Sequence, residues 1–120
     1  MVHDKSFQFA LSIIHLCEGF NPKISYKLID QLLRAGTSIG ANIRESKRAE
    51  SSADFIHKLS IAQKECEETM YWLELFFSAE YIGESKFKAL YSDAEELMKL
   101  LSSIIKSKRE AAAKFYVESD

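Results

Sequence analysis

The sequence predicts an all-α protein, an antiparallel up-down-up-down four-helix bundle formed by a single domain over residues 1–120. Apolar residues recur at alternating steps of three and four along most of the chain, which is the spacing of one helix face. The four glycines and the single proline are too few for a turn-rich β fold. The breaks between the periodic segments are short, and short connections favour antiparallel neighbours.

A glycine and an Asn-Pro pair separate the first two helices. The first helix is expected over residues 4–18, because Gly19 suits the position that follows a helix. Pro22 is expected to open the second helix, over residues 23–49, with Asn21 as its N-cap.

The second helix carries an apolar stripe that runs through two glycines. Leu32, Gly36, Ile39 and Ile43 share one face, and Gly40 lies beside them. A glycine inside a helix costs about 1 kcal/mol relative to alanine. We therefore expect a second backbone to approach this helix closely at the two glycines.

Two further helices follow. The third is expected over residues 52–80, with Ser51 as N-cap and Asp54 at the capping-box position. Gly83 then interrupts the pattern, and the fourth helix starts with Glu84 in its first turn, where the helix dipole favours negative charge. The basic residues near Arg109 favour its C-terminal end, and a polar tail that we expect to fray follows. Its apolar face comprises Phe87, Leu90, Tyr91, Ala94, Leu97, Met98, Leu101 and Ile105.

Two of the helices carry a second apolar face that one small bundle cannot cover. On the first helix, Phe7, Leu11 and Ile14 share one face, while Phe9, Ile13, Leu16 and Phe20 repeat on nearly the opposite face, and both faces favour burial. Large exposed apolar patches are uncommon on soluble monomers, so these faces predict self-association. The alternative is a monomer with some exposed aromatic side chains. The candidate subunit interface comprises Phe9, Ile13, Leu16, Ile61, Glu65, Glu68, Trp72 and Leu75.

Charge is spread unevenly between the helices. The second helix carries a basic ridge, whereas the stretch from Glu65 to Glu96 is mostly acidic. Opposite signs on different surfaces can steer a head-to-tail contact that closes into a ring. The candidate nucleic-acid-binding residues are Arg34, Arg44, Arg48, Lys106 and Lys108.

Two of these arginines have a second candidate role. A carboxylate beside Trp72 is costly to bury without a donor, and Arg34 or Arg44 could supply that donor to Glu65 and Glu68. The donor could come from the same bundle or from a neighbouring subunit. A solvated pair of glutamates is the alternative.

Composition limits the location and the partners. The net charge of −2 means that any binding of nucleic acid or anionic membrane must be local. Cys17 and Cys66 lie on apolar stripes, as reduced thiols of a cytoplasmic protein do. No apolar run reaches the roughly 18 residues of a membrane span, and the N-terminus lacks a signal pattern. We expect a soluble cytoplasmic protein with no membrane partner.

Residue types that serve in catalysis or metal binding do not form a recognisable motif in this sequence. A di-iron bundle requires Glu-x-x-His, and the nearest approach, residues 54–57, places His57 outward. No phosphate-binding loop is present, because Gly36 and Gly40 lie within a helix and no Lys-Ser/Thr pair follows them. Neither cysteine has an activating neighbour in the pattern. We expect no enzymatic activity, no metal and no cofactor.

Three segments carry a resemblance to a known family. Residues 34–45, 53–62 and 64–75, which include Ser38-Ile39, Asn42-Ile43, Glu45 and Glu68, resemble proteins encoded by intervening sequences in bacterial 23S rRNA genes, the S23 ribosomal protein family. The resemblance implies a left-handed antiparallel bundle that assembles as a homopentamer. A related protein is the accessory variability protein of diversity-generating retroelements, which binds nucleic acid and a reverse transcriptase through a strongly basic barrel. This chain differs from that relative because its net charge is slightly negative.

These observations favour a non-enzymatic homo-oligomeric scaffold. It would bind RNA or a nucleic-acid-associated protein through the basic residues of the second helix and of the stretch from Lys106 to Lys114. The alternative is a purely protein-binding adaptor with no nucleic-acid role. Salt-dependent RNA binding distinguishes the two functions, because contacts with phosphate weaken steeply as ions are added.

Overall fold

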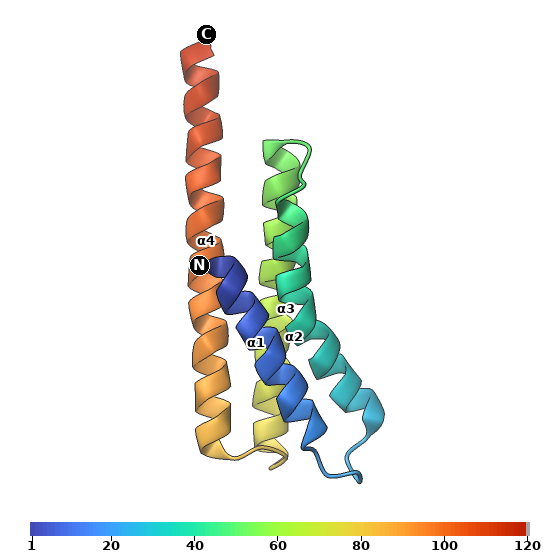
Figure 1. Ribbon diagram of the computed structural model, residues 1–120. Coiled ribbons are helices and arrows are strands. Elements are labelled where there is room, and N and C mark those ends of the chain that lie inside the picture. Colours follow the sequence, from blue (N-terminus) through green and yellow to red (C-terminus); the bar gives the residue numbers. More distant parts are fainter. Residues whose placement is uncertain (120) are drawn as a thin grey trace.

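The computed structural model describes the backbone of residues 1–119 and the side chains of residues 1–114. It consists of four helices, α1 (Val2–Glu18), α2 (Tyr26–Ser46), α3 (Ser52–Ser78) and α4 (Glu84–Ser119), with no strand in the described part of the chain. Successive helices run in opposite directions, as the up-down-up-down prediction requires (Figure 1).

Each helix packs mainly against its neighbours in the sequence. α2 lies between α1 and α3, and α3 lies between α2 and α4. α1 crosses the bundle obliquely and contacts α4 over a shorter stretch, while α4 continues past the turn that joins α2 to α3 (Figure 1). The molecule is therefore elongated, with extents of 62 × 23 × 20 Å.

The core follows the predicted helical faces. All four helices contribute fully buried side chains, and Phe20 of the turn after α1 packs edge-on against Phe76 at a centroid distance of 5.4 Å. Burial of this apolar surface is the main stabilising term for such a fold. The largest side chains with less than 2% exposure are Phe76, Ile13, Leu32, Ile39, Ile43, Leu59, Leu73, Leu97 and Leu101.

The two glycines of α2 form the contact with α1. A Cβ placed on Gly36 would lie 2.9 Å from Cγ1 of Ile13, and one placed on Gly40 would lie 3.5 Å from the carbonyl oxygen of Ser6. The predicted close approach of a second backbone is confirmed at Gly40, where the backbone of α1 comes nearest. At Gly36 the missing side chain makes room for Ile13 instead.

The prediction that Phe9, Ile13 and Leu16 face another subunit is wrong. Phe9 and Ile13 are only 3% and 0% exposed, and Leu16 packs against the same core. Phe7, on the other apolar face of the helix, is 54% exposed. Both faces are apolar, so hydrophobicity alone does not choose between them; the fit of Ile13 over Gly36 does. Phe9, Ile13 and Leu16 therefore belong to the core of their own chain and not to a subunit interface.

The predicted bounds of the second helix are too wide. Pro22 lies in a separate turn, and Asn21 caps that turn, since its Oδ1 accepts a hydrogen bond from the Lys23 N–H at 2.9 Å. α2 begins only at Tyr26, after the N-cap Ser25, and ends at Ser46.

The start of the third helix is confirmed. The hydroxyl of Ser51 accepts a hydrogen bond from the Asp54 N–H at 3.0 Å. The carboxylate of Asp54 reaches back to the N–H of Glu50, at 3.2 Å. The two bonds satisfy donors that a helix start leaves open.

The ends of the remaining helices differ from expectation in two ways. Gly19 closes α1 with φ of −92°, so its conformational freedom is not used, whereas Glu80 after α3 has a positive φ of 66°. α4 also continues to Ser119, well past Arg109, where a polar tail was expected.

Candidate nucleic-acid and subunit interfaces

Basic groups converge where the end of α2 meets the start of α1. Partial burial is the largest cause that lowers the pKa of His3, followed by the charges of Lys47 and the N-terminal amine; Asp4 opposes the shift, and Arg44 adds a smaller lowering effect. Positive charges therefore surround a histidine that stays neutral near pH 7. The predicted site residues included Arg44 but neither Lys47 nor His3. Lys47 could have been found from its place beside Arg48, and His3 from the antiparallel pairing of the first two helices.

The other predicted basic residues divide into two groups. Arg48 follows the C-terminal end of α2, and Lys106 lies in the C-terminal half of α4; both are exposed, and both helices run towards the upper end of Figure 1. Lys108 also lies there, with its ammonium 5.1 Å from the centre of the Phe55 ring. Arg34 lies about 15 Å further down α2, at 1.5 Å per residue from Arg44. We call Arg44, Lys47, Arg48, Lys106 and Arg109 the basic end.

Arg34 is engaged within its own chain. Its Nη2 donates to Glu68 Oε1 at 3.1 Å, and the Trp72 indole N–H donates to the same oxygen at 3.5 Å. The prediction that an arginine of the second helix supplies the donor for Glu68 is confirmed for Arg34. The pair joins α2 to α3 and is half-exposed, so it sets their register more than it stabilises the fold.

Glu65 remains without a donor. Its Oε2 is buried, and it has no hydrogen-bond partner among the side chains that the structure describes. The residue lies between two ion pairs that link α2 and α3, Arg34–Glu68 and Glu45–Lys58, the latter at 3.8 Å. Neither predicted arginine reaches it.

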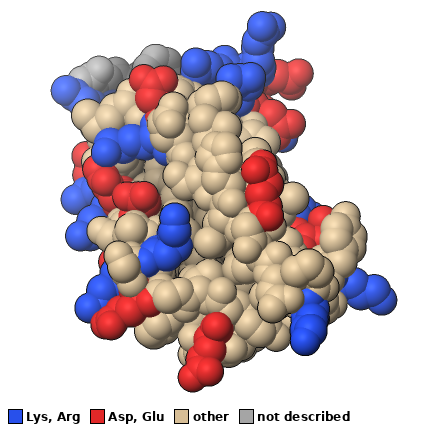
Figure 2. All heavy atoms as spheres, turned by 60° about the horizontal axis from the view of Figure 1, so that its bottom comes forward, with Lys and Arg blue, Asp and Glu red and all other residues tan. Residues whose placement is uncertain are grey.

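Exposed apolar side chains gather on α1 and α3, while Tyr26 is exposed alone at the start of α2. On α3, Tyr71 and Leu75 are 55% and 40% exposed and lie beside Trp72; we call these three residues the α3 patch. On α1, Phe7 lies with the half-buried Leu11 and Ile14, which we call the α1 patch. Residues 6–17 of α1 contain no Lys, Arg, Asp or Glu, and a broad uncharged band crosses this face (Figure 2).

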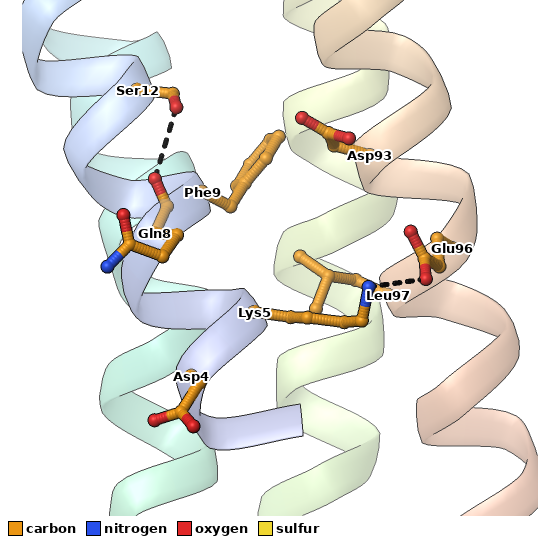
Figure 3. Close-up of a pocket in the computed structure, with 8 residues that line it drawn as sticks. All are labelled: Asp4, Lys5, Gln8, Phe9, Ser12, Asp93, Glu96 and Leu97. Carbon is orange, nitrogen blue, oxygen red and sulfur yellow. Dashed lines mark hydrogen bonds and ion pairs between the residues drawn. The ribbon is translucent and has the colours of Figure 1, made fainter. Parts of the chain in front are cut away.

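A groove opens where α1 and α4 diverge. It has a volume of about 270 Å³, and Phe9 and Leu97 form its apolar floor (Figure 3). Lys5 of α1 bridges to Glu96 of α4, with Nζ 2.6 Å from Oε1. We call this the acidic groove. Its lining residues are Asp4, Lys5, Gln8, Phe9, Ser12, Asp93, Glu96 and Leu97.

Neither thiol is placed for catalysis. Burial raises the pKa of Cys17 to about 11, and burial together with the charge of Glu67 raises the pKa of Cys66 to about 12. Both are therefore protonated at neutral pH and poorly nucleophilic. His57 is exposed, and no three His, Cys, Asp or Glu side chains within residues 1–114 are grouped to hold a metal ion.

None of the helices described combines the length and the hydrophobicity that crossing a bilayer requires.

The fold and these surfaces define an all-α bundle protein with uncovered apolar patches and a basic end. The chain belongs to the family of 23S rRNA-intervening sequence proteins, whose model matches residues 1–103. The resemblance predicted from three segments of the sequence is thereby confirmed.

One solved structure carries the comparison further. A protein with unknown function from the S23 ribosomal protein family of Bacteroides thetaiotaomicron is 50% identical to this chain, with a TM-score of 0.85. The match covers 88% of this chain and 99% of that one. No curated protein matches the chain. The family match ends before Lys106, so Lys106 and the basic residues that follow it in α4 lie outside the matched part.

Proposed function

We propose that the protein is a non-enzymatic homo-oligomeric scaffold, a ring of identical subunits, that binds RNA through its basic end. The observation that carries self-association is the exposure of the α1 patch and the α3 patch, with Phe7 at 54%, Tyr71 at 55% and Leu75 at 40%. A second copy is the simplest cover for apolar surface on a domain of this size. The resemblance to the S23 family is the basis for expecting five subunits.

Binding of RNA is supported by where the positive charge lies. The molecule as a whole carries a charge of −2, yet Arg44 and Lys47 surround His3 at the same end as Arg48, Lys106 and Arg109. In a ring, this end is repeated in every subunit, which multiplies weak phosphate contacts. The alternative, an adaptor that binds only protein, is favoured by the acidic groove.

Light scattering tests self-association. A mass several times 13.7 kDa is expected, and the double variant Phe7→Gln, Leu75→Gln should lower it, because both substitutions make exposed apolar positions polar. Tyr26→Gln, which makes an exposed aromatic position outside both patches polar, provides the control. A wild-type monomer at micromolar concentration would contradict the proposal.

Retention of single-stranded RNA at low and high salt tests the basic end. Replacing Arg44 and Arg48 with Gln should weaken binding and flatten its salt dependence, because each lost phosphate contact lowers the slope by about 0.7. Lys23→Gln with Lys27→Gln removes the same charge near the opposite end of α2 and should change the slope little. Wild-type protein that retains no RNA in a salt-sensitive manner would favour the protein-binding adaptor.

A further inference from the structure

We propose that the acidic groove of one subunit receives the C-terminal arm of a second copy of this chain, the arm being residues 106–114 of α4. The proposal rests on the proposed self-association and names the surfaces that meet in it. In the ring, Lys106 and Arg109 are then taken up by this contact, and RNA binding falls to Arg44, Lys47 and Arg48 of the basic end. Each subunit then offers one groove and one arm, which makes a head-to-tail contact, and such contacts form a ring where the rotation between neighbours closes.

The groove provides negative charge over an apolar floor. Asp4 comes from α1, and Asp93 and Glu96 come from α4, on the two sides of Phe9 and Leu97 (Figure 3). Within residues 1–114, Lys5 bridges to Glu96, whereas Asp4 and Asp93 carry no ion pair. A volume of about 270 Å³ suits long side chains with aliphatic stems better than it suits a whole helix.

The arm provides the complementary charge. It contains Lys106, Lys108, Arg109 and Lys114 against the single acid Glu110. Lys106, Arg109 and Lys114 are exposed, while Lys108 already lies against Phe55 of its own chain. Lysine and arginine combine an aliphatic stem with a charged head, so they match both the floor and the rim of the groove.

The arm cannot reach the groove of its own chain. Both belong to α4, and Arg109 lies 16 residues after Asp93, which is about 24 Å along a continuous helix. The contacts Gln63–Ser102, at 2.9 Å, and Phe55–Lys108 fix α4 against α3 over this length. A second copy is therefore the only chain of this sequence that can fill the groove with an arm.

The charge pattern of α4 gives the contact a direction. From Glu84 to Glu96 the helix has four acids and two lysines, and from Lys99 to Lys114 it has five basic residues and one acid. Charge segregation of this kind opposes parallel alignment of two α4 helices and steers an arm toward a groove. The groove lies within the family match, which ends at residue 103, whereas the arm lies beyond it.

Mixing two variants tests the contact. The groove variant Asp4→Lys, Asp93→Lys and the arm variant Lys106→Glu, Arg109→Glu should each show a lower mass than wild type in light scattering at low salt. Mixed together, they should regain a higher mass than either variant alone, since the arm of the first fits the groove of the second and the acidic arm of the second meets the basic groove of the first. Glu67→Lys with Glu74→Lys is the charge-matched control and should keep the wild-type mass.

Cysteine cross-linking gives an independent readout if a charge variant folds poorly. Asp93→Cys mixed with Arg109→Cys should give a cross-linked pair, whereas either variant alone should not. Undiminished mass for both charge variants, or no cross-link, would overturn the arm contact. If Phe7→Gln with Leu75→Gln nevertheless dissociates the assembly, the proposed scaffold stands and is held by its apolar patches alone. A monomeric wild type would overturn both proposals.

Discussion

Glu80 occupies a backbone conformation that disfavours its own side chain. Its φ of 66° follows α3, where its N–H bonds to Phe77 O at 3.0 Å and the next N–H, of Tyr81, bonds to Phe76 O at 2.9 Å. This pair of bonds is a Schellman ending, and the rings of Tyr81 and Phe76, 5.6 Å apart, supply its hydrophobic contact. A residue other than glycine costs roughly 1–2 kcal/mol in this conformation.

We predict that Glu80→Gly raises the free energy of unfolding by about 0.5–1 kcal/mol, after the entropy that glycine adds to the unfolded chain is subtracted. Urea denaturation measures the change. Gly19→Ala is the matched comparison: its φ of −92° suits alanine and its nearest contact would be an ordinary 3.7 Å, so no loss is expected there. A lower urea midpoint for Glu80→Gly than for wild type would contradict backbone strain at Glu80.

The close contact at Gly36 makes a prediction of opposite sign. Gly36→Ala should lower the free energy of unfolding by roughly 1–3 kcal/mol, because its Cβ would lie 2.9 Å from Ile13 and that side chain is enclosed on all sides. Gly83→Ala, where a Cβ meets nothing within 4 Å, should not show this loss. Combining Gly36→Ala with Ile13→Ala should recover part of the overpacking cost in a double-mutant cycle.

His3 should make stability and RNA binding depend on pH. Its pKa is lowered below 6.5 in the folded protein, so the unfolded chain binds more protons between the two pKa values. The stability of wild type relative to His3→Gln should therefore fall as the pH drops through 6.5. Phosphate at the basic end would raise this pKa again, so acidification should strengthen RNA binding more in wild type than in His3→Gln. If stability and RNA binding depend on pH in the same way in both proteins, the placement of His3 beside the basic groups would be contradicted.

At the level of elements, the ion pair between α2 and α3 should contribute little. Arg34 and Glu68 are 52% and 30% exposed, and exposed pairs are worth about 0.2–1 kcal/mol. A double-mutant cycle of Arg34→Ala and Glu68→Ala should give a coupling energy in that range, reduced by added salt. A coupling well above it would mean that assembly buries the pair.

Local sequence rules predicted the elements that depend on local interactions. Ser51 and Asp54 bond as a cap because both partners lie within one turn, and the apolar stripe of α2 is buried where the periodicity placed it. The start of α2 was missed because Asn21 can cap a short turn as well as a helix. The buried face of α1 was missed because two apolar faces compete, and the choice depends on Ile13 meeting Gly36, which is distant in sequence.

The same limit applies to the candidate sites. Arg44, Arg48 and Lys106 could be picked from charge alone, whereas His3 joins them only through the packing of α1 on α2. Arg34 looked equivalent to Arg44 in the sequence, but its position along α2 places it opposite Glu68 of α3. The acidic groove depends on the oblique path of α1, which no spacing pattern encodes.

For the whole molecule, the order in which the helices pack has a consequence for synthesis on the ribosome. Every major contact joins helices that are consecutive in the chain, so α1, α2 and α3 can pack as they emerge. α4 emerges last, and both the acidic groove and the basic end depend on it. A nascent chain therefore lacks both the groove and the arm until its final helix is made, although the α1 patch and the α3 patch are already present.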